Sequence, residues 1–215
     1  MPTTKFDAVI FDMDGVIVDS EPLHERAFLQ VFDEIGFGTT HGIDFPSYFG
    51  KSDLVLWKDF IARHRPPQSL DELLARKEET FVKLLRREEP VFTGLPELLE
   101  NLLPRYPIAL ASGSRHPTIQ AVLEIRELRR FFSVIVSSED VPHGKPAPDI
   151  FLRTAALLGV PSSACCVIED SAAGITAARA AGMTAIGITN SLTAGELAHA
   201  TQVVSTYAEI RELLS

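Results

Sequence analysis

Apolar residues gather along this chain in five short runs, and the stretches between most of them repeat apolar positions with a helical period. Within each run the apolar residues are consecutive, which is typical of strands buried on both faces of a parallel sheet. Alternating strands and helices imply right-handed crossovers and a doubly wound α/β fold. The predicted strands are 8–11, 108–111, 134–136, 165–168 and 184–188.

The segments between the later strands carry helix start and stop signals. One helix is predicted to begin after Ser171, a favoured N-cap, and to end before Gly182, a favoured residue just past a last turn. Pro148 and Gly159 bracket a second predicted helix in the same way. A third segment has leucines at a helical spacing. Its predicted apolar face consists of Leu98, Leu99, Leu102 and Leu103.

After the first strand comes a long stretch without a convincing buried strand. It has amphipathic helical patterns instead, of which LDELLARKEETFVKLLRRE at 70–88 is the longest. This much helical material is too long for a simple crossover between neighbouring strands. We therefore predict an inserted helical domain over residues 18–89, and an α/β core domain formed by residues 1–17 and 90–215.

Composition and charge narrow the classes of partner. The chain has 215 residues, of which 46% are hydrophobic and 23% charged, so it can bury a sizeable core. Its formal net charge of −9 argues against nucleic acid or an anionic membrane as partner, because both call for a basic face. Acidity also simply aids solubility, and that reading says nothing about function. We expect a monomer that binds a small molecule.

The chain shows no signs of secretion or membrane insertion. No apolar run approaches the length of a membrane span, and the N-terminus has no signal-peptide pattern. The two cysteines, Cys165 and Cys166, are adjacent in an apolar run, where a disulfide between them would be strained. We therefore expect both to be reduced core residues of a cytoplasmic protein.

Carboxylates, hydroxyls and a lysine follow the predicted strands at their carboxyl ends, the edge where open α/β sheets bind ligands. Several carboxylates on one crevice would destabilise the fold unless a cation lay among them. Mg²⁺ meets this need, because it is a hard cation that takes oxygen ligands. A helix cap is the alternative for Ser171, and a solvated loop is the alternative for Glu139 and Asp140. The collected residues are Asp12, Asp14, Ser112, Gly113, Ser114, Glu139, Asp140, Lys145, Glu169, Asp170 and Ser171.

A crevice lined by carboxylates, hydroxyls and a lysine suits the binding of a phosphoryl group. A carboxylate held by a metal ion and a lysine is ionised at neutral pH and can act as a nucleophile. A second carboxyl two residues later lies on the same side of an extended segment, where it can protonate a leaving oxygen and later activate water. This chemistry explains why the first strand ends in the pair Asp12 and Asp14.

These motifs resemble the haloacid dehalogenase superfamily, specifically the phosphatases and mutases related to beta-phosphoglucomutase. The similar segments are FDMDGVIVDSEP, LASGS, GKPAPDIF and VIEDSAAGI, and they run in order along nearly the whole chain. The resemblance implies a Rossmann-like core and a helical cap formed by the insertion. It implies Asp12 as nucleophile, Asp14 as acid/base and as metal ligand through its carbonyl, Ser112 and Lys145 on the phosphoryl group, and Asp12, Asp14, Glu169 and Asp170 around Mg²⁺.

The resemblance extends to substrate-binding positions. In the second motif these are Gly113 and Ser114, and His116 stands where the mutase has asparagine. In the cap they are His24, Lys51, Ser52 and Lys77. Both His24 and Lys77 have the alternative of being ordinary solvated helix residues. The mutase carries an arginine for a second phosphate where this chain has Asp53, and Lys51 is the residue that could compensate.

We therefore expect a Mg²⁺-dependent phosphatase that acts on a small phosphorylated metabolite, a sugar or polyol phosphate, through an aspartyl-phosphate. The presence of Asp14 favours phosphate esters, because dehalogenases of this superfamily lack the second aspartate. A sugar-phosphate mutase is the alternative enzyme. A non-catalytic binding protein on the same fold is the alternative of a different class.

Overall fold

The computed structural model describes residues 6–48 and 52–215 and divides the chain into two compact units. The core unit combines Met1–Asp19 with Glu89–Ser215, and the helical unit is Ser20–Glu88. The inserted unit thus begins two residues after the predicted boundary at 18 and ends one residue before the predicted boundary at 89.

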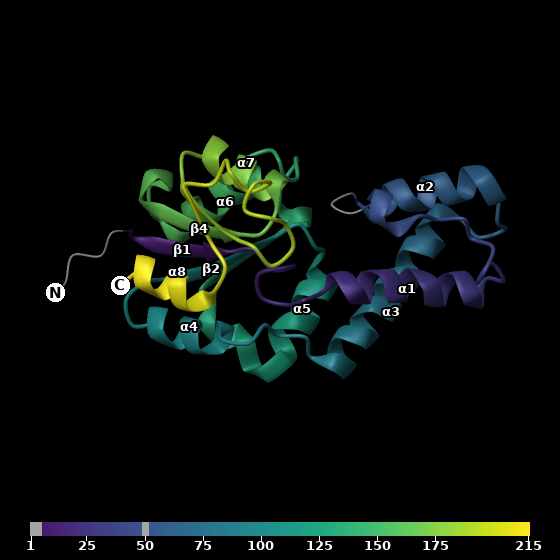
Figure 1. The fold of residues 1–215 in the computed structure, drawn as a ribbon, viewed down its shortest axis with the longest axis horizontal. Helices are drawn as coiled ribbons and strands as arrows, with labels where there is room; N and C mark the ends of the chain where they lie inside the picture. The colour runs from purple at the N-terminus through teal and green to yellow at the C-terminus, as the bar shows by residue number, and fades with distance from the viewer. Residues whose placement is uncertain (1–5, 49–51) are drawn as a thin grey trace. The chain divides into compact units, whose positions relative to one another are not determined.

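The core unit is built around a six-stranded parallel sheet with the order β3-β2-β1-β4-β5-β6 (Figure 1). The chain starts in the middle with β1, adds β2 and β3 on one side, and then crosses back to add β4, β5 and β6 on the other. The switch between the two directions therefore falls at β1, beside β4, where such sheets leave a crevice at the carboxyl ends. The strands are β1 (Ala8–Phe11), β2 (Ile108–Ser112), β3 (Val134–Ser137), β4 (Cys165–Glu169), β5 (Thr184–Ile188) and β6 (Gln202–Val204).

The strand register determines how far each central strand extends toward the carboxyl edge of the sheet, and so where the polar residues after it lie. Phe11 pairs with Leu110 of β2 and with Ile168 of β4, so the three central strands end almost level. Every residue of β1, β2 and β4 is buried, which confirms the reading of consecutive apolar residues as strands covered on both faces. The residues that follow these strands are thereby carried to one edge of the sheet.

Helices cover both faces of the sheet. In Figure 1, α6 and α7 lie on one face, and α4 and α8 lie on the other. The predicted helix signals are confirmed: the Ser171 side chain accepts a hydrogen bond from the Gly174 backbone at the start of α7, and Gly159 ends α6 with a left-handed φ of 72°. The helical segments are α4 (Leu95–Leu102), α5 (His116–Glu124), α6 (Asp149–Leu158), α7 (Ala172–Ala180) and α8 (Tyr207–Leu213), with short 3-10 turns η2 (Ile125–Phe131), η3 (Ser138–Asp140) and η4 (Ser162–Ala164).

The structure corrects the sequence-based description of the core unit at three points. Leu103 is 46% exposed and does not belong to the apolar face of α4, because the helix ends at Leu102 and the chain turns there toward β2. The strand β6 was not predicted, because it has only three residues and its first, Gln202, is exposed at the edge of the sheet. In addition, Ser112 and Glu169 are the last residues of their strands, whereas the sequence placed them just after.

The helical unit consists of α1 (Glu21–Glu34), η1 (Phe45–Tyr48), α2 (Asp53–His64) and α3 (Leu70–Glu88). Its interior is aromatic: Phe32 lies 4.7 Å from Phe60 and 5.2 Å from Trp57 between ring centroids. Trp57, the single tryptophan of the chain, is completely buried there. The unit therefore has its own hydrophobic core, as an independently packed insertion requires.

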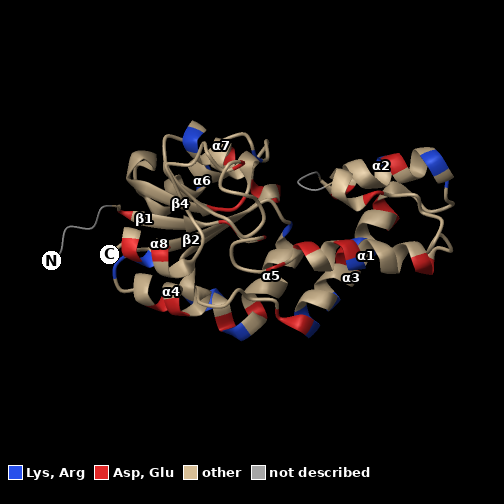
Figure 2. Cartoon of the chain, viewed as in Figure 1, with Lys and Arg blue, Asp and Glu red and all other residues tan. Residues whose placement is uncertain are grey.

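The remaining sequence features concern charge and cysteine. Blue and red positions are interspersed over the helices, and no described helix is basic over most of its length (Figure 2). Among the described residues, no helix combines the length and apolar character needed to cross a lipid bilayer. Cys165 and Cys166 are both buried and form no disulfide, as predicted, and burial raises the pKa of the Cys165 thiol to about 11.

Candidate active site

Three carboxylates meet at the carboxyl ends of β1 and β4. Asp12 follows β1 directly, Glu169 ends β4, and Asp170 comes next, so the register of the two strands brings them together. One carboxylate oxygen from each lies within 4.8 Å of the others, and all three residues are buried. Oxygen donors in such a group are the ligands that Mg²⁺ and similar hard cations take.

Lys145 supplies a positive charge to this group. Its Nζ lies 2.6 Å from Asp12 Oδ1 and 2.5 Å from Glu169 Oε1, and its side chain is only 11% exposed. When all three carboxylates are ionised, one ammonium leaves the group with a net charge of minus two. A divalent cation is the species that would bring this balance to zero.

The pKa values reflect the same imbalance. Burial raises the pKa of Asp12 well above its ordinary value, Lys145 opposes this, and the neighbouring carboxylates add to it. Burial, together with Glu169, raises the pKa of Asp170 to about 7. Burial also disfavours the ammonium of Lys145, but the two carboxylates outweigh it and keep its pKa above the ordinary value. The cluster thus holds more negative charge than its own cation compensates.

Glu169 is the most firmly fixed of the three carboxylates. Its Oε2 accepts hydrogen bonds from the backbone N–H groups of Asp170 and Ser171 and from the Ser171 hydroxyl, at 2.8 to 2.9 Å. Its Oε1 takes the contact with Lys145. Both oxygens therefore have strong donors, and Glu169 holds Lys145 beside Asp12. Ser171 caps α7 as predicted and also binds Glu169.

Two glycines make room for these carboxylates. A Cβ atom at Gly174 would lie 1.7 Å from Glu169 Oε1, and one at Gly15 would lie 1.7 Å from Asp170 Oδ2. Gly15 also has a φ of 72°, a conformation that L residues rarely adopt. Glycine is therefore required at both positions, in the first and the fourth motif.

Asp14 is turned toward the second motif. Its Oδ2 accepts a hydrogen bond of 2.8 Å from the Ser114 hydroxyl, and it is not among the three residues that converge. Ser112 is completely buried, and its Oγ accepts a hydrogen bond from the Ser114 backbone at 3.0 Å. The four carboxylates expected at one point are thus divided into a group of three and one that faces a hydroxyl. Gly113 lies between the two serines, and a Cβ there would meet nothing within 4 Å.

A second row of polar residues, none of them among the predicted site residues, holds the loop after Asp14 in place. Asn190 donates from Nδ2 to the Gly15 carbonyl at 2.8 Å and to the Tyr207 hydroxyl at 3.0 Å. The Tyr207 hydroxyl donates to the Val16 carbonyl at 2.6 Å. The Ser191 hydroxyl donates to Asp170 Oδ2 through a short hydrogen bond. Asn190 and Ser191 follow β5, so the rule of polar residues after strands would have found them; Tyr207 had no such signal.

The polar residues after β3 have a structural role. Glu139 accepts a hydrogen bond from the His116 backbone at the start of α5 and pairs with Arg115 at 3.1 Å. Asp140 forms a capping box with Ser137, and its Oδ1 contacts the His116 ring at 3.1 Å. Glu139 and Asp140 therefore cap local structure, in place of the solvated loop considered from the sequence.

In the helical unit, Lys77 is buried, so the alternative of a solvated helix residue is wrong for it. Its side chain is 2% exposed, with Nζ 2.7 Å from Asp53 Oδ2 and 2.5 Å from His24 Nδ1. Burial and the nearby Lys77 lower the pKa of His24 well below its ordinary value. Ser52 is exposed just before α2, and Lys51 lies outside the described residues.

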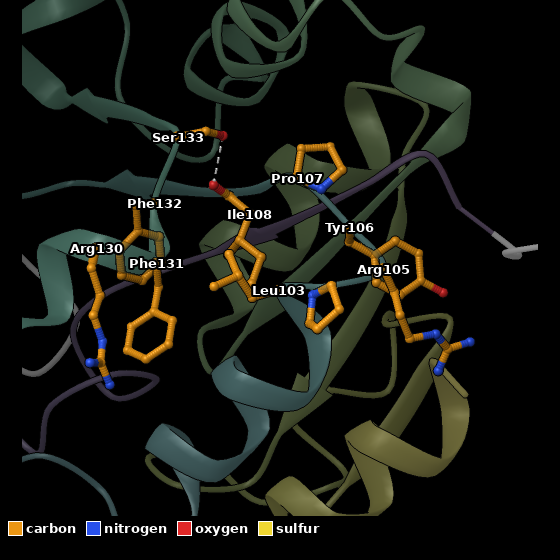
Figure 3. A pocket seen from close by; sticks show the side chains of 10 residues that line it. Leu103, Arg105, Tyr106, Pro107, Ile108, Arg130, Phe131, Phe132 and Ser133 are labelled. Atoms are coloured by element: carbon orange, nitrogen blue, oxygen red, sulfur yellow. Dashed lines mark hydrogen bonds between the residues drawn. The ribbon is translucent and has the colours of Figure 1, made fainter.

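A pocket of about 410 Å³ lies elsewhere in the core unit, between the segment before β2 and the segment before β3 (Figure 3). The Ser133 hydroxyl donates to the Ile108 carbonyl at 3.0 Å across it. These residues lie at the amino ends of the strands, the opposite edge from the carboxylate group. No residue of the predicted site contributes to this pocket.

The comparisons with known proteins agree with this geometry. The model of the haloacid dehalogenase-like hydrolases matches residues 6–182. Fructose-1-phosphate phosphatase YqaB of Escherichia coli is 35% identical over 188 residues, covering 86% of this chain and 97% of its own length. Hexitol phosphatase B of Escherichia coli is 33% identical, covering 83% of this chain and 82% of its own. The beta-phosphoglucomutase structure from Clostridium difficile superposes with a TM-score of 0.79 at 26% identity, covering 95% of this chain and 93% of that one.

The parallel sheet flanked by helices and the phosphatases among the similar proteins define the class: a hydrolase that acts on phosphate esters. The chain belongs to the haloacid dehalogenase-like hydrolases. Within this family it is a phosphatase of the sugar-phosphatase and beta-phosphoglucomutase-like group.

Proposed function

We propose that this protein is a Mg²⁺-dependent phosphatase that releases inorganic phosphate from a small sugar or polyol monophosphate. The observation that carries the proposal is the position of Asp12, held 2.6 Å from Lys145 in a buried group with Glu169 and Asp170. The names of the relatives, a fructose-1-phosphate phosphatase and a hexitol phosphatase, support this substrate class.

The donor set fits Mg²⁺. Asp12 and Asp170, with Glu169 beside them, offer only oxygen atoms, and their excess negative charge is what a divalent cation would offset. Asp14 would add its backbone carbonyl. When bound, the ion would offset the repulsion between the carboxylates and the phosphate dianion.

In the first half of the proposed reaction, a carboxylate oxygen of Asp12 attacks the phosphorus atom and the ester P–O bond breaks. Asp14 donates a proton to the leaving oxygen, which departs as the alcohol. Lys145 and the hydroxyl of Ser112 donate hydrogen bonds to the equatorial phosphoryl oxygens, where charge spreads in the transition state. The Ser114 hydroxyl, bonded to Asp14, orients the acid.

In the second half, water attacks the phosphorus atom of the aspartyl-phosphate on Asp12. Asp14, now a carboxylate, takes the proton of this water, and the bond between phosphorus and the Asp12 oxygen breaks. Inorganic phosphate leaves, and both aspartates return to their starting states. The same residue thus serves as acid and then as base.

The helical unit is proposed to be a cap that selects the substrate, with His24, Ser52 and Lys77 as its substrate-binding positions and Lys51 in the segment outside the described residues. The mutase alternative shares the aspartyl-phosphate chemistry and is represented by the similar Clostridium difficile structure. It needs a fixed cation for a second phosphate, and Lys77, the buried cation here, is paired with Asp53. We therefore favour hydrolysis.

The test is a panel of phosphate esters scored for free phosphate, with Mg²⁺ and with excess chelator. We expect activity only with Mg²⁺, and none in Asp12→Asn, which keeps the shape of the side chain but loses the nucleophile. Asp14→Asn should lose about 10²–10⁴-fold in kcat. Near-normal turnover by Asp12→Asn, or full activity in chelator, would contradict the proposal.

A coupled assay separates hydrolysis from isomerisation. Beta-glucose 1-phosphate is supplied with a bisphosphate primer, and glucose 6-phosphate and free phosphate are measured in parallel. We expect free phosphate to exceed glucose 6-phosphate. Isomerisation that outruns phosphate release by a wide margin would identify a mutase.

A further inference from the structure

Ser191 is a polar residue beside the carboxylate group that has no part in the proposed reaction. It follows β5, and its hydroxyl donates a short hydrogen bond to Asp170 Oδ2. The residue is exposed, so it contributes little to the packing of the core unit. What distinguishes this serine is therefore its hydrogen bond to Asp170.

The three carboxylates of the group are held very unequally. Glu169 Oε2 accepts three hydrogen bonds, and its Oε1 contacts Lys145, which also binds Asp12 Oδ1. Within the described parts of the chain, only the Ser191 hydroxyl donates a hydrogen bond to the Asp170 carboxylate. The hydrogen-bonded orientation of Asp170 therefore depends on a single side chain.

The residues on either side of Ser191 fix its backbone. Asn190 donates from Nδ2 to the Gly15 carbonyl at 2.8 Å, which ties this segment to the loop after Asp14. On the other side, Leu192 packs against the apolar core around the sheet. The Ser191 hydroxyl is thus presented from an anchored segment, as a group that orients a metal ligand must be.

Gly15 encloses the same oxygen of Asp170 from a second direction. A Cβ atom at Gly15 would lie 1.7 Å from Asp170 Oδ2 and 2.6 Å from Ser191 Oγ, so the Gly15 backbone lies close against both atoms. The other carboxylate oxygen, Oδ1, accepts no hydrogen bond from any residue that the structure describes. Asp170 is therefore arranged to offer a cation one oxygen and to keep the other engaged with the protein.

We infer that Ser191 is a positioning residue that makes Asp170 a ligand through one oxygen atom and thereby favours Mg²⁺ over Ca²⁺. Mg²⁺ demands a small and nearly ideal octahedron, and the two oxygens of one carboxylate are too close together to occupy two of its corners. Ca²⁺ takes about six to eight oxygen atoms at longer distances and readily binds both oxygens of a carboxylate. The inference rests on the proposed function, because it concerns the ion proposed there.

The experiment is calorimetric titration of the metal-free protein with magnesium chloride and, separately, with calcium chloride. The quantity compared is the ratio of the Kd for Ca²⁺ to the Kd for Mg²⁺. Ser191→Ala should weaken Mg²⁺ binding about tenfold, the lower end of the range of about 10–100-fold for groups that orient metal ligands, because water reaches this exposed position. Binding of Ca²⁺ should weaken less, since Asp170 is then free to turn both oxygens toward the ion, and the ratio should fall.

Three further variants serve as controls. Ser191→Thr keeps the hydroxyl, and its added methyl group has room at an exposed position, so it should keep the parent's ratio. Ser133→Ala is the matched control, because it also removes an exposed hydroxyl with one hydrogen bond, here to the Ile108 carbonyl at 3.0 Å, at the opposite edge of the sheet. It should leave both Kd values unchanged. Asp170→Asn should lose the binding of both ions and so locates the titration at this site.

The outcomes separate the inference from the proposed function. A parent protein that binds no Mg²⁺, or binds it no better than Asp170→Asn does, would overturn the metal site of the proposed function. If the parent binds Mg²⁺ at this site, unchanged Kd values in Ser191→Ala would overturn this inference alone. So would an equal loss for Mg²⁺ and Ca²⁺, because Ser191 would then have no part in the choice of ion, or a Ser191→Thr protein that behaves like Ser191→Ala.

Discussion

The strongest electrostatic prediction concerns Lys145, whose removal should destabilise the core unit before any question of catalysis arises. In Lys145→Met the ammonium disappears from between Asp12 and Glu169, at 2.6 and 2.5 Å, while the methionine fills much of the same space. Breaking a buried ion pair by removing one partner costs about 3–5 kcal/mol. Because the Oε2 atom of Glu169 keeps its three donors, we expect the lower end of this range, about 3 kcal/mol.

The assay is urea unfolding in the presence of chelator, followed by far-UV circular dichroism. With an m value of about 2 kcal/mol per M, a loss of about 3 kcal/mol lowers the midpoint by about 1.5 M. Lys145→Met leaves both Asp12 and Glu169 without their cation, and adding Glu169→Gln removes one of these two charges while keeping an acceptor for the donors around residue 169. The double variant should therefore recover part of the stability, yet have no phosphatase activity, because nothing holds Asp12.

Two results would refute this reasoning. A Lys145→Met protein within about 0.5 kcal/mol of the parent in chelator would mean that the carboxylates do not depend on the lysine, since changes of that size are ordinary for surface sites. A double variant as unstable as the single one would assign the loss to packing and not to charge. Addition of Mg²⁺ should partly restore Lys145→Met, because it supplies positive charge to the same carboxylates.

The remaining predictions concern pH and the loop after Asp14. Burial and Lys77 lower the pKa of His24 in the folded state. As the pH is lowered through the unfolded-state pKa of about 6.5, the unfolded state therefore binds more protons than the folded state, and the free energy of unfolding decreases. The unfolding midpoint read from Trp57 fluorescence should thus drop between pH 7.5 and 5.5, and less so in His24→Gln; equal drops in both proteins would exclude His24 as the cause. Tyr207→Phe removes the donor to the Val16 carbonyl and should lower kcat with little change in KM, along with about 1–3 kcal/mol of stability. Tyr106→Phe, which loses a similar buried hydrogen bond to Leu214 away from the site, should lose stability alone, and an equal loss of kcat in both would count against a positioning role for Tyr207.

The sequence by itself determined five of the six strands of the sheet and the edge of the sheet where the candidate site lies. Runs of consecutive apolar residues identify strands such as β1 and β4, because only strands covered on both faces tolerate them. Parallel strands send their carboxyl ends to one edge, so the polar residues that follow them, Asp12 and Asp170 among them, are placed on that edge without any knowledge of contacts. The five long strands and the inserted helical segment follow from pattern alone.

Tertiary structure decided everything that depends on which side chains meet. The helical pattern of α3 does not distinguish Lys77 from a solvated position, although the family resemblance singles it out, and only the packing of three helices shows that it is buried against Asp53 and His24. Asn190 and Tyr207 support the loop after Asp14 across 175 and 191 residues of chain, a pairing that no local pattern encodes. Local periodicity reports which face of an element is covered, but the partner that covers it comes from elsewhere in the chain, so the identity of each contact belongs to the fold.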